Sequence, residues 1–273
     1  MKNLFFKSLS IILLTVLMSL VFVSAVAEEW VLVDNESIVV KIKEFGEDSM
    51  WGHTMKVYME NKTDKLLMYS IDSCAVNGVM NDPFWAKEVM AGSKANAEVS
   101  WFDMKGNASN IGITQLDFSF RVYDSEDWMA DALLDQSYTI YPKGESSVVL
   151  DEYSPSSSDI MLFDNNNATM IITGFSDDEI WGYTANVYVN NKTDNPLMFS
   201  VENSTVNGFM CDPFWATEVR ANTSAYTSIS WMQEDFEMND ITNVEEIVLA
   251  VRVYDSEDWM ADAVIEQQFT ITP

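Results

Sequence analysis

The chain has few of the residues that catalytic and metal sites use most. Of its 273 residues only one, His53, is histidine. This excludes histidine-rich zinc sites and metalloprotease centres, and a Ser-His-Asp triad would depend on that single residue. The ten glycines are dispersed and form no phosphate-binding loop. A glycosidase pair of carboxylates needs a cleft, of which the pattern gives no sign. We therefore expect no catalytic activity.

Cysteine is scarce as well. Cys74 and Cys211 fall in different halves of the chain and do not occupy equivalent positions. Each half is long enough to bury a core without a disulfide. Two buried, unpaired thiols are the simpler interpretation. A bridge between the halves is the alternative, because exported proteins meet an oxidising environment.

Basic residues are few, with 15 Lys and Arg against 43 Asp and Glu and a formal net charge of −28. Residues 28–142 carry 20 acidic and 9 basic side chains, and residues 160–273 carry 19 and 3. This negative field repels nucleic acid and anionic membrane surfaces, so neither is an expected partner. A solvated, mutually repelling surface is the simplest explanation of the acidity.

A long apolar run occurs at the amino end. Lys2 and Lys7 accompany the apolar stretch 9–23, and Ala25-Val26-Ala27 then offers small residues where a signal peptidase cleaves. We predict a signal peptide over residues 1–27 and a secreted or extracellular protein. The alternative is an uncleaved signal anchor at the cell surface, because the run approaches the length of a short membrane span.

The remainder of the chain consists of two similar segments. Residues 76–89 and 206–219 differ at three of fourteen positions, and RVYDSEDWMADA occurs at 121–132 and again at 252–263. We interpret this as a tandem duplication with an offset of 130 or 131 residues. The predicted parts are repeat 1 over 28–142, a linker with a Ser/Pro-rich end over 143–159, and repeat 2 over 160–273.

Both repeats show the sequence period of β-strands. Phe118, Phe120 and Val122 alternate with more polar residues over 117–123, and Leu249, Val251 and Val253 repeat the apolar positions in the second copy, as expected for strands with one buried face. Asn77-Gly78 is typical of a tight hairpin turn with positive φ. We predict an all-β protein with an antiparallel immunoglobulin-like β-sandwich in each repeat. A β-barrel is the alternative.

Three motifs occur in both repeats: Asn-Lys-Thr-Asp, Asp-Pro-Phe-Trp and Tyr-Asp-Ser-Glu-Asp-Trp. With them, the chain resembles immunoglobulin-like domains of uncharacterised exported or surface proteins of Gram-positive bacteria. The resemblance covers nearly all of both repeats. It implies an immunoglobulin-like sandwich and an extracellular or surface location. It implies no activity, cofactor or catalytic residue.

Acidic residues gather before the final strand of each repeat. Calcium takes six to eight oxygen ligands from flexible loops, so a calcium site is the alternative to a solvated surface here. The spacing fits no established calcium loop and lacks the glycine of its sharp turn. The candidate ligands are Asp124, Glu126, Asp127, Asp131, Asp255, Glu257, Asp258 and Asp262.

Tryptophans recur at matched positions in the two repeats. Those in loops suit a stacking platform for a surface glycan or an anchor for a protein partner. The alternative is that they fold back and close the ends of the sandwich. The candidate platform residues are Trp85, Trp128, Trp215 and Trp259.

Together these patterns predict a non-catalytic exported adhesion or interaction protein. Its expected partner is a protein or a surface glycan, and the sequence does not identify which. Two similar domains on one linker favour a repetitive partner that is bound with increased avidity. A calcium-dependent or glycan-binding module is the alternative function, and calcium is the sole cofactor that any pattern indicates.

Overall fold

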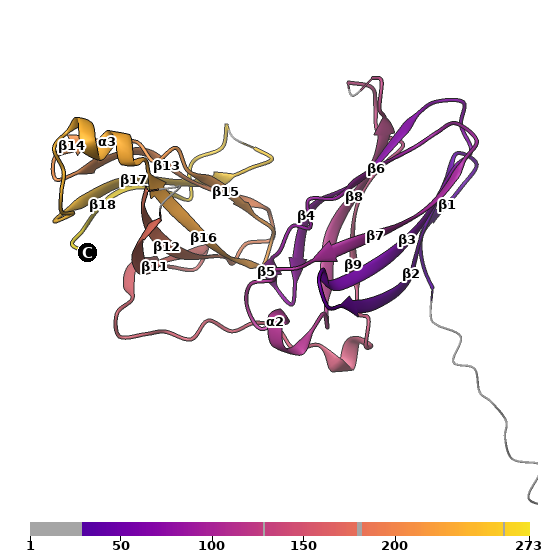
Figure 1. Cartoon of the computed structure of the whole chain (residues 1–273), viewed down its shortest axis with the longest axis horizontal. Helices are drawn as coiled ribbons and strands as arrows, with labels where there is room; N and C mark the ends of the chain where they lie inside the picture. The colour runs from indigo at the N-terminus through magenta and orange to yellow at the C-terminus, as the bar shows by residue number, and fades with distance from the viewer. Residues whose placement is uncertain (1–28, 128, 179–181, 259) are drawn as a thin grey trace, which may run out of the picture.

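The structure, a computed structural model, describes residues 29–127, 129–178, 182–258 and 260–273 (Figure 1). Regular structure in these residues is almost entirely β-strand, which confirms the all-β prediction. The short helical segments are α2 (Ala108–Ile111), α3 (Gln233–Met238) and a 3-10 turn at Glu145–Ser147. The predicted signal peptide, Trp128 and Trp259 lie outside the described residues.

The first half forms two layers of strands. One sheet has the order β1-β2-β3-β7, and the other contains the order β5-β4-β8-β9 with β6 also paired to β4. Neighbouring strands within these orders are antiparallel. The strands are β1 (Trp30–Asp34), β2 (Ile38–Asp48), β3 (Gly52–Asn61), β4 (Leu67–Val76), β5 (Val79–Met80), β6 (Ala86–Val89), β7 (Lys94–Trp101), β8 (Leu116–Asp124) and β9 (Leu134–Ile140).

The second half repeats this order of elements. Its sheets are β10-β11-β12-β16 and β14-β13-β17-β18, with β15 also paired to β13. An irregularity in the pairing of β2 with β3, at Ile42/Glu44, recurs between β11 and β12 at Ile172/Gly174. The strands are β10 (Ile160–Asp164), β11 (Ala168–Asp178), β12 (Gly182–Asn191), β13 (Leu197–Val206), β14 (Phe209–Met210), β15 (Ala216–Val219), β16 (Ser224–Trp231), β17 (Ile247–Asp255) and β18 (Ile265–Ile271).

Alternation in the sequence determines which side chains form each core. Along β8, Leu116, Phe118, Phe120 and Val122 are fully buried, and the residues between them are partly exposed. β17 shows the same alternation. Burying a side chain of this size stabilises the fold by about 1.5–3 kcal/mol. Each half therefore has a core of its own between its two sheets.

A buried amide accounts for the repeated Asn-Lys-Thr-Asp motif. Asn61 is fully buried, and its Nδ2 donates to the carbonyls of Lys65 at 2.8 Å and Val89 at 2.9 Å. Its Oδ1 accepts the backbone N–H of Thr63 at 2.9 Å. Asn191 makes the equivalent bonds in the second half. The motif thus fixes a turn to the core through its asparagine side chain.

Cys74 and Cys211 are both buried and unpaired. Burial raises the pKa of each thiol. This agrees with the interpretation of two buried, unpaired thiols rather than a bridge.

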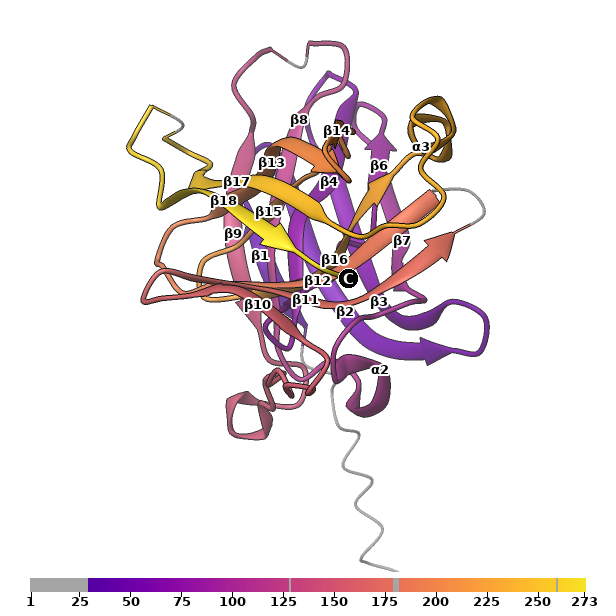
Figure 2. The same ribbon diagram turned by 90° about the vertical axis from the view of Figure 1, so that its left-hand side faces the viewer.

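The two halves meet along one continuous sheet. The single-residue parallel pairing of β5 with β16 joins Val79 to Ser224, and the backbone N–H of Ser224 donates to Gly78 O at 2.9 Å. Figure 2 views the molecule from the end formed by the second half, with its strands in front of those of the first. None of the described helices is long and apolar enough to span a membrane.

Candidate functional site

The repeated Asp-Pro-Phe-Trp segments form the same turn in both halves, ahead of β6 and ahead of β15. The backbone N–H of Phe84 donates to Asp82 Oδ1 at 2.9 Å, and that of Phe214 donates to Asp212 Oδ1 at 3.2 Å. An aspartate that accepts a hydrogen bond from the backbone two residues later defines a tight turn. The sequence thus encodes this local geometry twice.

The tryptophan of each segment packs inward. Trp85 packs against the core of the first half with its ring centroid 6.1 Å from that of Phe120. Trp215 is buried in the core of the second half, and its indole Nε1 donates to Thr227 Oγ1 at 3.3 Å. Both tryptophan carbonyls also accept backbone N–H groups, Trp85 from Ile71 and Trp215 from Val201. These contacts hold the turn on both sides of its tip.

The phenylalanine before each tryptophan points into solvent. Phe84 and Phe214 are both 97% exposed, the highest value among the exposed large hydrophobic side chains. Their backbone φ angles are 48° and 44°, in the left-handed region that a bulky residue rarely adopts. Such a conformation costs about 1–3 kcal/mol. Each half therefore keeps a strained aromatic residue that adds nothing to its core.

The predicted tryptophan platform is only partly described by the structure. Trp85 and Trp215 lie against the cores, as the alternative interpretation expects, whereas Trp128 and Trp259 lie outside the described residues. Sequence reasoning missed Phe84 and Phe214. In a turn, adjacent residues follow no strand period, so the pattern alone did not show which of Phe and Trp faces inward.

The acidic segments place one carboxylate from each half in a turn. Asp124 is buried and accepts Lys65 Nζ at 2.7 Å and the backbone N–H of Glu126 at 3.0 Å. The hydrogen bond from Lys65, followed by that from Glu126, lowers the pKa of Asp124. Lys65 and Glu126 thus occupy both oxygens of the Asp124 carboxylate.

In the second half a neutral amide takes the place of the lysine. Asp255 accepts the backbone N–H of Glu257 at 2.9 Å and Asn195 Nδ2 at 2.8 Å. These two hydrogen bonds lower the pKa of Asp255.

The remaining candidate calcium ligands point outward. Glu126, Asp127, Asp131, Glu257, Asp258 and Asp262 are all exposed. Within the described residues, no group of three or more His, Cys, Asp or Glu side chains is arranged to hold a metal ion. Calcium binding remains a prediction for titration to check.

No family model matches the sequence, and the search of curated proteins found no match. Solved structures gave weak similarities to bacterial chaperones. The YadV chaperone is 12% identical, with 86% of this chain and 100% of that chain covered and a TM-score of 0.23. The SafA pilin–SafB chaperone complex of Salmonella enterica is 11% identical, with 88% of this chain and 98% of that chain covered and a TM-score of 0.23. The CsuC–CsuE complex of Acinetobacter baumannii is 11% identical, with 80% of this chain and 91% of that chain covered and a TM-score of 0.23. At such TM-scores these similarities carry no argument about fold or function.

Proposed function

We propose that this protein is a non-catalytic, exported interaction protein that binds a protein partner through Phe84 and Phe214. The observation that carries the proposal is the same strained, fully exposed phenylalanine in both halves. Strain opposes folding of the isolated chain, and an exposed aromatic ring contributes no burial to offset it. A bound partner that buries the ring would supply that burial.

Each half is proposed to be an immunoglobulin-like sandwich, and the two are proposed to be tandem repeats over 28–142 and 160–273. The strand order supports this. The neighbours β2-β3-β7 and β4-β8-β9 match strands A-B-E and C-F-G of that fold, and β1 extends the first sheet. The leader over residues 1–27 supports export to the cell exterior or surface.

A protein is the better candidate than a glycan. Phenylalanine has no polar group with which to orient a sugar, and Trp85 and Trp215 are held against the cores. Buried aromatic anchors at protein interfaces contribute about 2 kcal/mol or more each. The net charge of −28 favours a partner with basic residues around the pocket that receives the ring.

Two anchors on one chain make the interaction bivalent. Once Phe84 of the first half is bound, Phe214 meets a second site on a repetitive partner at high effective concentration. Each contact alone then has a low affinity, and the two contacts together give a high affinity for the repetitive partner.

The proposal is tested by the binding of fluorescently labelled protein to the cells that export it. Phe84→Ala and Phe214→Ala are each expected to weaken binding roughly tenfold or more, and the double variant to abolish it. Phe102→Ala is the matched control, because Phe102 is 79% exposed and lies outside the two turns. Unchanged unfolding midpoints verify that the variants fold. A double variant that binds as well as Phe102→Ala contradicts the proposal.

Enzymatic treatment of the cells separates the two partner classes. Protease treatment is expected to remove binding, and periodate oxidation of surface sugars to leave it intact. The reverse result would indicate the glycan-binding alternative.

A further inference from the structure

The junction between the two halves joins two different surfaces. The first half contributes the β4–β5 hairpin, whose Gly78 carbonyl accepts the backbone N–H of Ser224 at the start of β16. The second half also contributes Arg220, which donates to Ser119 Oγ at 2.9 Å and Ser137 Oγ at 3.3 Å. Such a heterologous contact uses one surface of each half and leaves the complementary surface of each half unused.

The unused surfaces are the β13–β14 hairpin of the second half and the start of β7 in the first. In Figure 1, β5 lies at the junction, whereas β14 lies at the end of the molecule farthest from the first half. The start of β7 stands beside the end of β3, where Lys94 is paired with Glu60. The chain therefore exposes the equivalents of both junction surfaces, one at β14 and the other at the start of β7.

Burial differs sharply between the used and unused surfaces. Val79 of β5 is 1% exposed, whereas Phe209, its counterpart in β14, is 48% exposed. Met80 packs partly buried against the core of the second half, whereas its counterpart Met210 is 64% exposed. On the strand side, Ser224 is buried and its counterpart Lys94 is exposed.

The second half has an open pocket at the position equivalent to the one that Arg220 contacts in the first half. Arg220 lies against Ser73, Ser119 and Ser137 at the junction. The equivalent residues of the second half, Asn203, Ala250 and Gln268, line an open pocket of about 520 Å³. Met90 stands in the first half where Arg220 stands in the second, and it is 68% exposed. The flexible, apolar side chain of methionine suits the apolar part of this lining, Ala250 and Val251.

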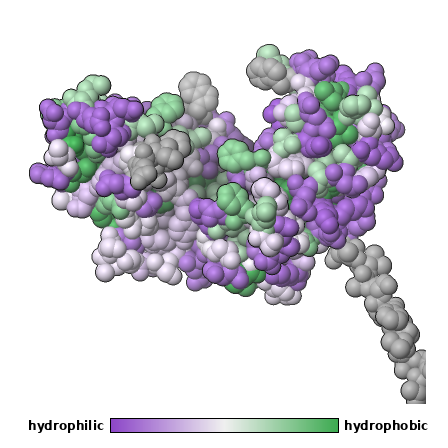
Figure 3. All heavy atoms as spheres, viewed as in Figure 1, coloured by the Kyte–Doolittle hydropathy of each residue, from purple (hydrophilic) through white to green (hydrophobic). Residues whose placement is uncertain are grey.

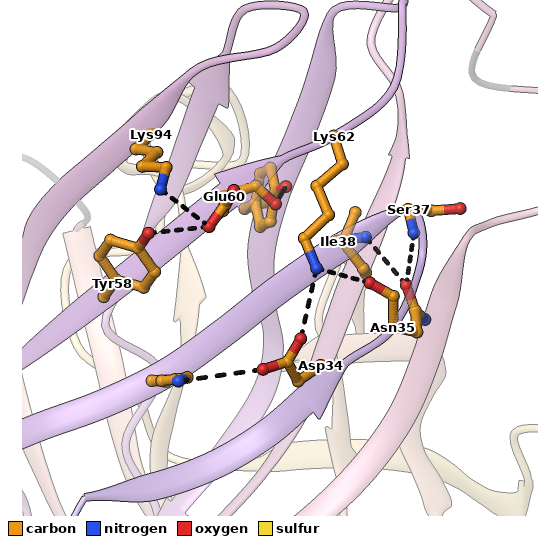
Figure 4. A network of polar contacts seen from close by, with 10 residues as sticks. Asp34, Asn35, Ser37, Ile38, Tyr58, Glu60, Lys62 and Lys94 are labelled. Carbon is orange, nitrogen blue, oxygen red and sulfur yellow. Dashed lines mark hydrogen bonds and ion pairs between the residues drawn. The ribbon is translucent and has the colours of Figure 1, made fainter.

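The charges of the unused surfaces also match. Lys94 replaces Ser224 and approaches Glu60 at 3.4 Å, beside Tyr58 (Figure 4). At the β14 hairpin, Asn207 Oδ1 accepts the backbone N–H groups of Glu245 at 2.8 Å and Glu246 at 3.0 Å. Two exposed acidic residues, Glu245 and Glu246, are thus joined through their backbone to the turn that a lysine would face in an equivalent contact.

We propose that a second copy of this chain covers the β14 hairpin. The hairpin of one chain docks on the start of β7 in the next chain, as β5 docks on β16 within one chain, with Met90 entering the pocket beside Ala250. Because the contact is heterologous, each added chain leaves one β14 hairpin and one β7 surface free for the next, and the assembly grows head to tail.

Sedimentation velocity over a series of protein concentrations tests this assembly, using the chain from Glu28 onward. The mean mass is expected to rise past that of a dimer as the concentration increases from about 5 to 500 µM. Met90→Asp and Met210→Asp are each expected to remain monomeric. Met90→Ser and Met210→Ser, which preserve the net charge, are expected to weaken association at least tenfold. Met50→Asp is the matched control, because Met50 is 73% exposed and lies on neither surface.

Mixing the two aspartate variants tests the head-to-tail geometry. Met90→Asp retains an intact β14 hairpin and Met210→Asp retains an intact β7 surface, so their mixture should form a one-to-one dimer and grow no further. The proposal is overturned by a wild-type chain that stays monomeric at every concentration, by a closed dimer that neither variant disrupts, or by a mixture that forms no dimer.

Discussion

The β4–β5 and β13–β14 hairpins contain the same Val-Asn-Gly turn, but only the first is covered by the other half of the molecule. Asn77 and Asn207 have φ angles of 52° and 51°, and the following glycines are also positive, so the local backbones agree. Asn77 is fully buried, whereas Asn207 is only half-buried. Local sequence thus determined the turn, and the neighbouring segments determined its environment.

The predicted linker is part of that environment. The backbone N–H of Asp151 donates to Asn77 O at 2.8 Å, and Asp151 Oδ1 accepts the backbone N–H of Asn107 at the same distance. Asp151 Oδ2 accepts the hydroxyl of Tyr226 from the second half at 3.1 Å. Tyr153 also stacks on Tyr188, with ring centroids 4.2 Å apart. The predicted linker over 143–159, despite its Ser/Pro-rich end, therefore contacts both halves and joins them.

The largest expected contrast is at the first residue of the two short strands. Val79→Asp buries an unpaired carboxylate at the junction and is expected to lower the free energy of unfolding by about 3 kcal/mol or more. Phe209→Asp exposes its carboxylate to water, and we expect a change within about 0.5 kcal/mol. Urea unfolding of both variants measures the contrast, and equal destabilisation would contradict it.

The second contrast concerns the turn asparagines. Asn77 Oδ1 accepts hydrogen bonds from the Thr114 backbone, the Thr114 hydroxyl and the Gln115 backbone, all within buried or partly buried surroundings. Glycine preserves the positive φ, so Asn77→Gly removes only the side chain. We expect a loss of about 2–3 kcal/mol, against about 1 kcal/mol for Asn207→Gly. Thermal unfolding compares the two, and the reverse order would show that the environments have been misassigned.

The third contrast exchanges the equivalent residues Arg220 and Met90. Arg220→Met removes the charged hydrogen bonds to Ser119 and Ser137 and is expected to cost about 1–2 kcal/mol at the junction. Met90→Arg changes an exposed residue, so the free energy of unfolding should stay within about 0.5 kcal/mol of wild type. Limited proteolysis of the 143–159 segment reports junction opening directly. Identical cleavage rates for both variants would argue against the junction.

A smaller contrast depends on pH. Lys65 lowers the pKa of Asp124 below its ordinary value of 3.8, so the stability that this pair adds is present above that value and lost as the pH falls below it. Lys65→Gln should therefore lower the unfolding midpoint slightly at pH 7, with the difference shrinking as the pH falls below 3.8. Asn195→Ala, the equivalent change in the second half, removes an uncharged hydrogen-bond donor to Asp255 and no ion pair. A pH-independent effect of Lys65→Gln would contradict the ion-pair assignment.

We expect the smallest effect from calcium. Asp124 and Asp255 are already engaged by donors, and the other carboxylates of the segments are exposed. These carboxylates therefore offer calcium no preformed site in the folded state. An ion stabilises a protein only when it binds the folded state better than the unfolded one, so the unfolding midpoint should not move at millimolar calcium. A rise of several degrees would establish the calcium-dependent alternative.

Strand periodicity predicted the parts of the fold where one face is buried. The alternation over 117–123 falls within β8, and the Asn-Gly turn has the positive φ angles that its residues favour. Hydrophilic residues gather over both ends of the visible face, with pale and hydrophobic residues between them (Figure 3). These features are local, and local sequence carries them.

Features that depend on contacts between distant segments were beyond the sequence. Nothing in the identical Asp-Pro-Phe-Trp segments shows that Phe84 faces solvent while Trp85 packs against Phe120. Likewise, the Val-Asn-Gly segments do not reveal that Ser224 covers only the first of the two hairpins. Such placements depend on which surfaces meet in three dimensions.

Hydrogen–deuterium exchange of the two hairpins tests the central comparison most directly. In dilute protein, amides of residues 76–81 should exchange at least about tenfold more slowly than those of residues 206–211, because the second half and the 143–159 segment cover the first hairpin only. The Ser224 amide, which donates to Gly78 O, should share that protection. Equal, rapid exchange of both hairpins would contradict the account.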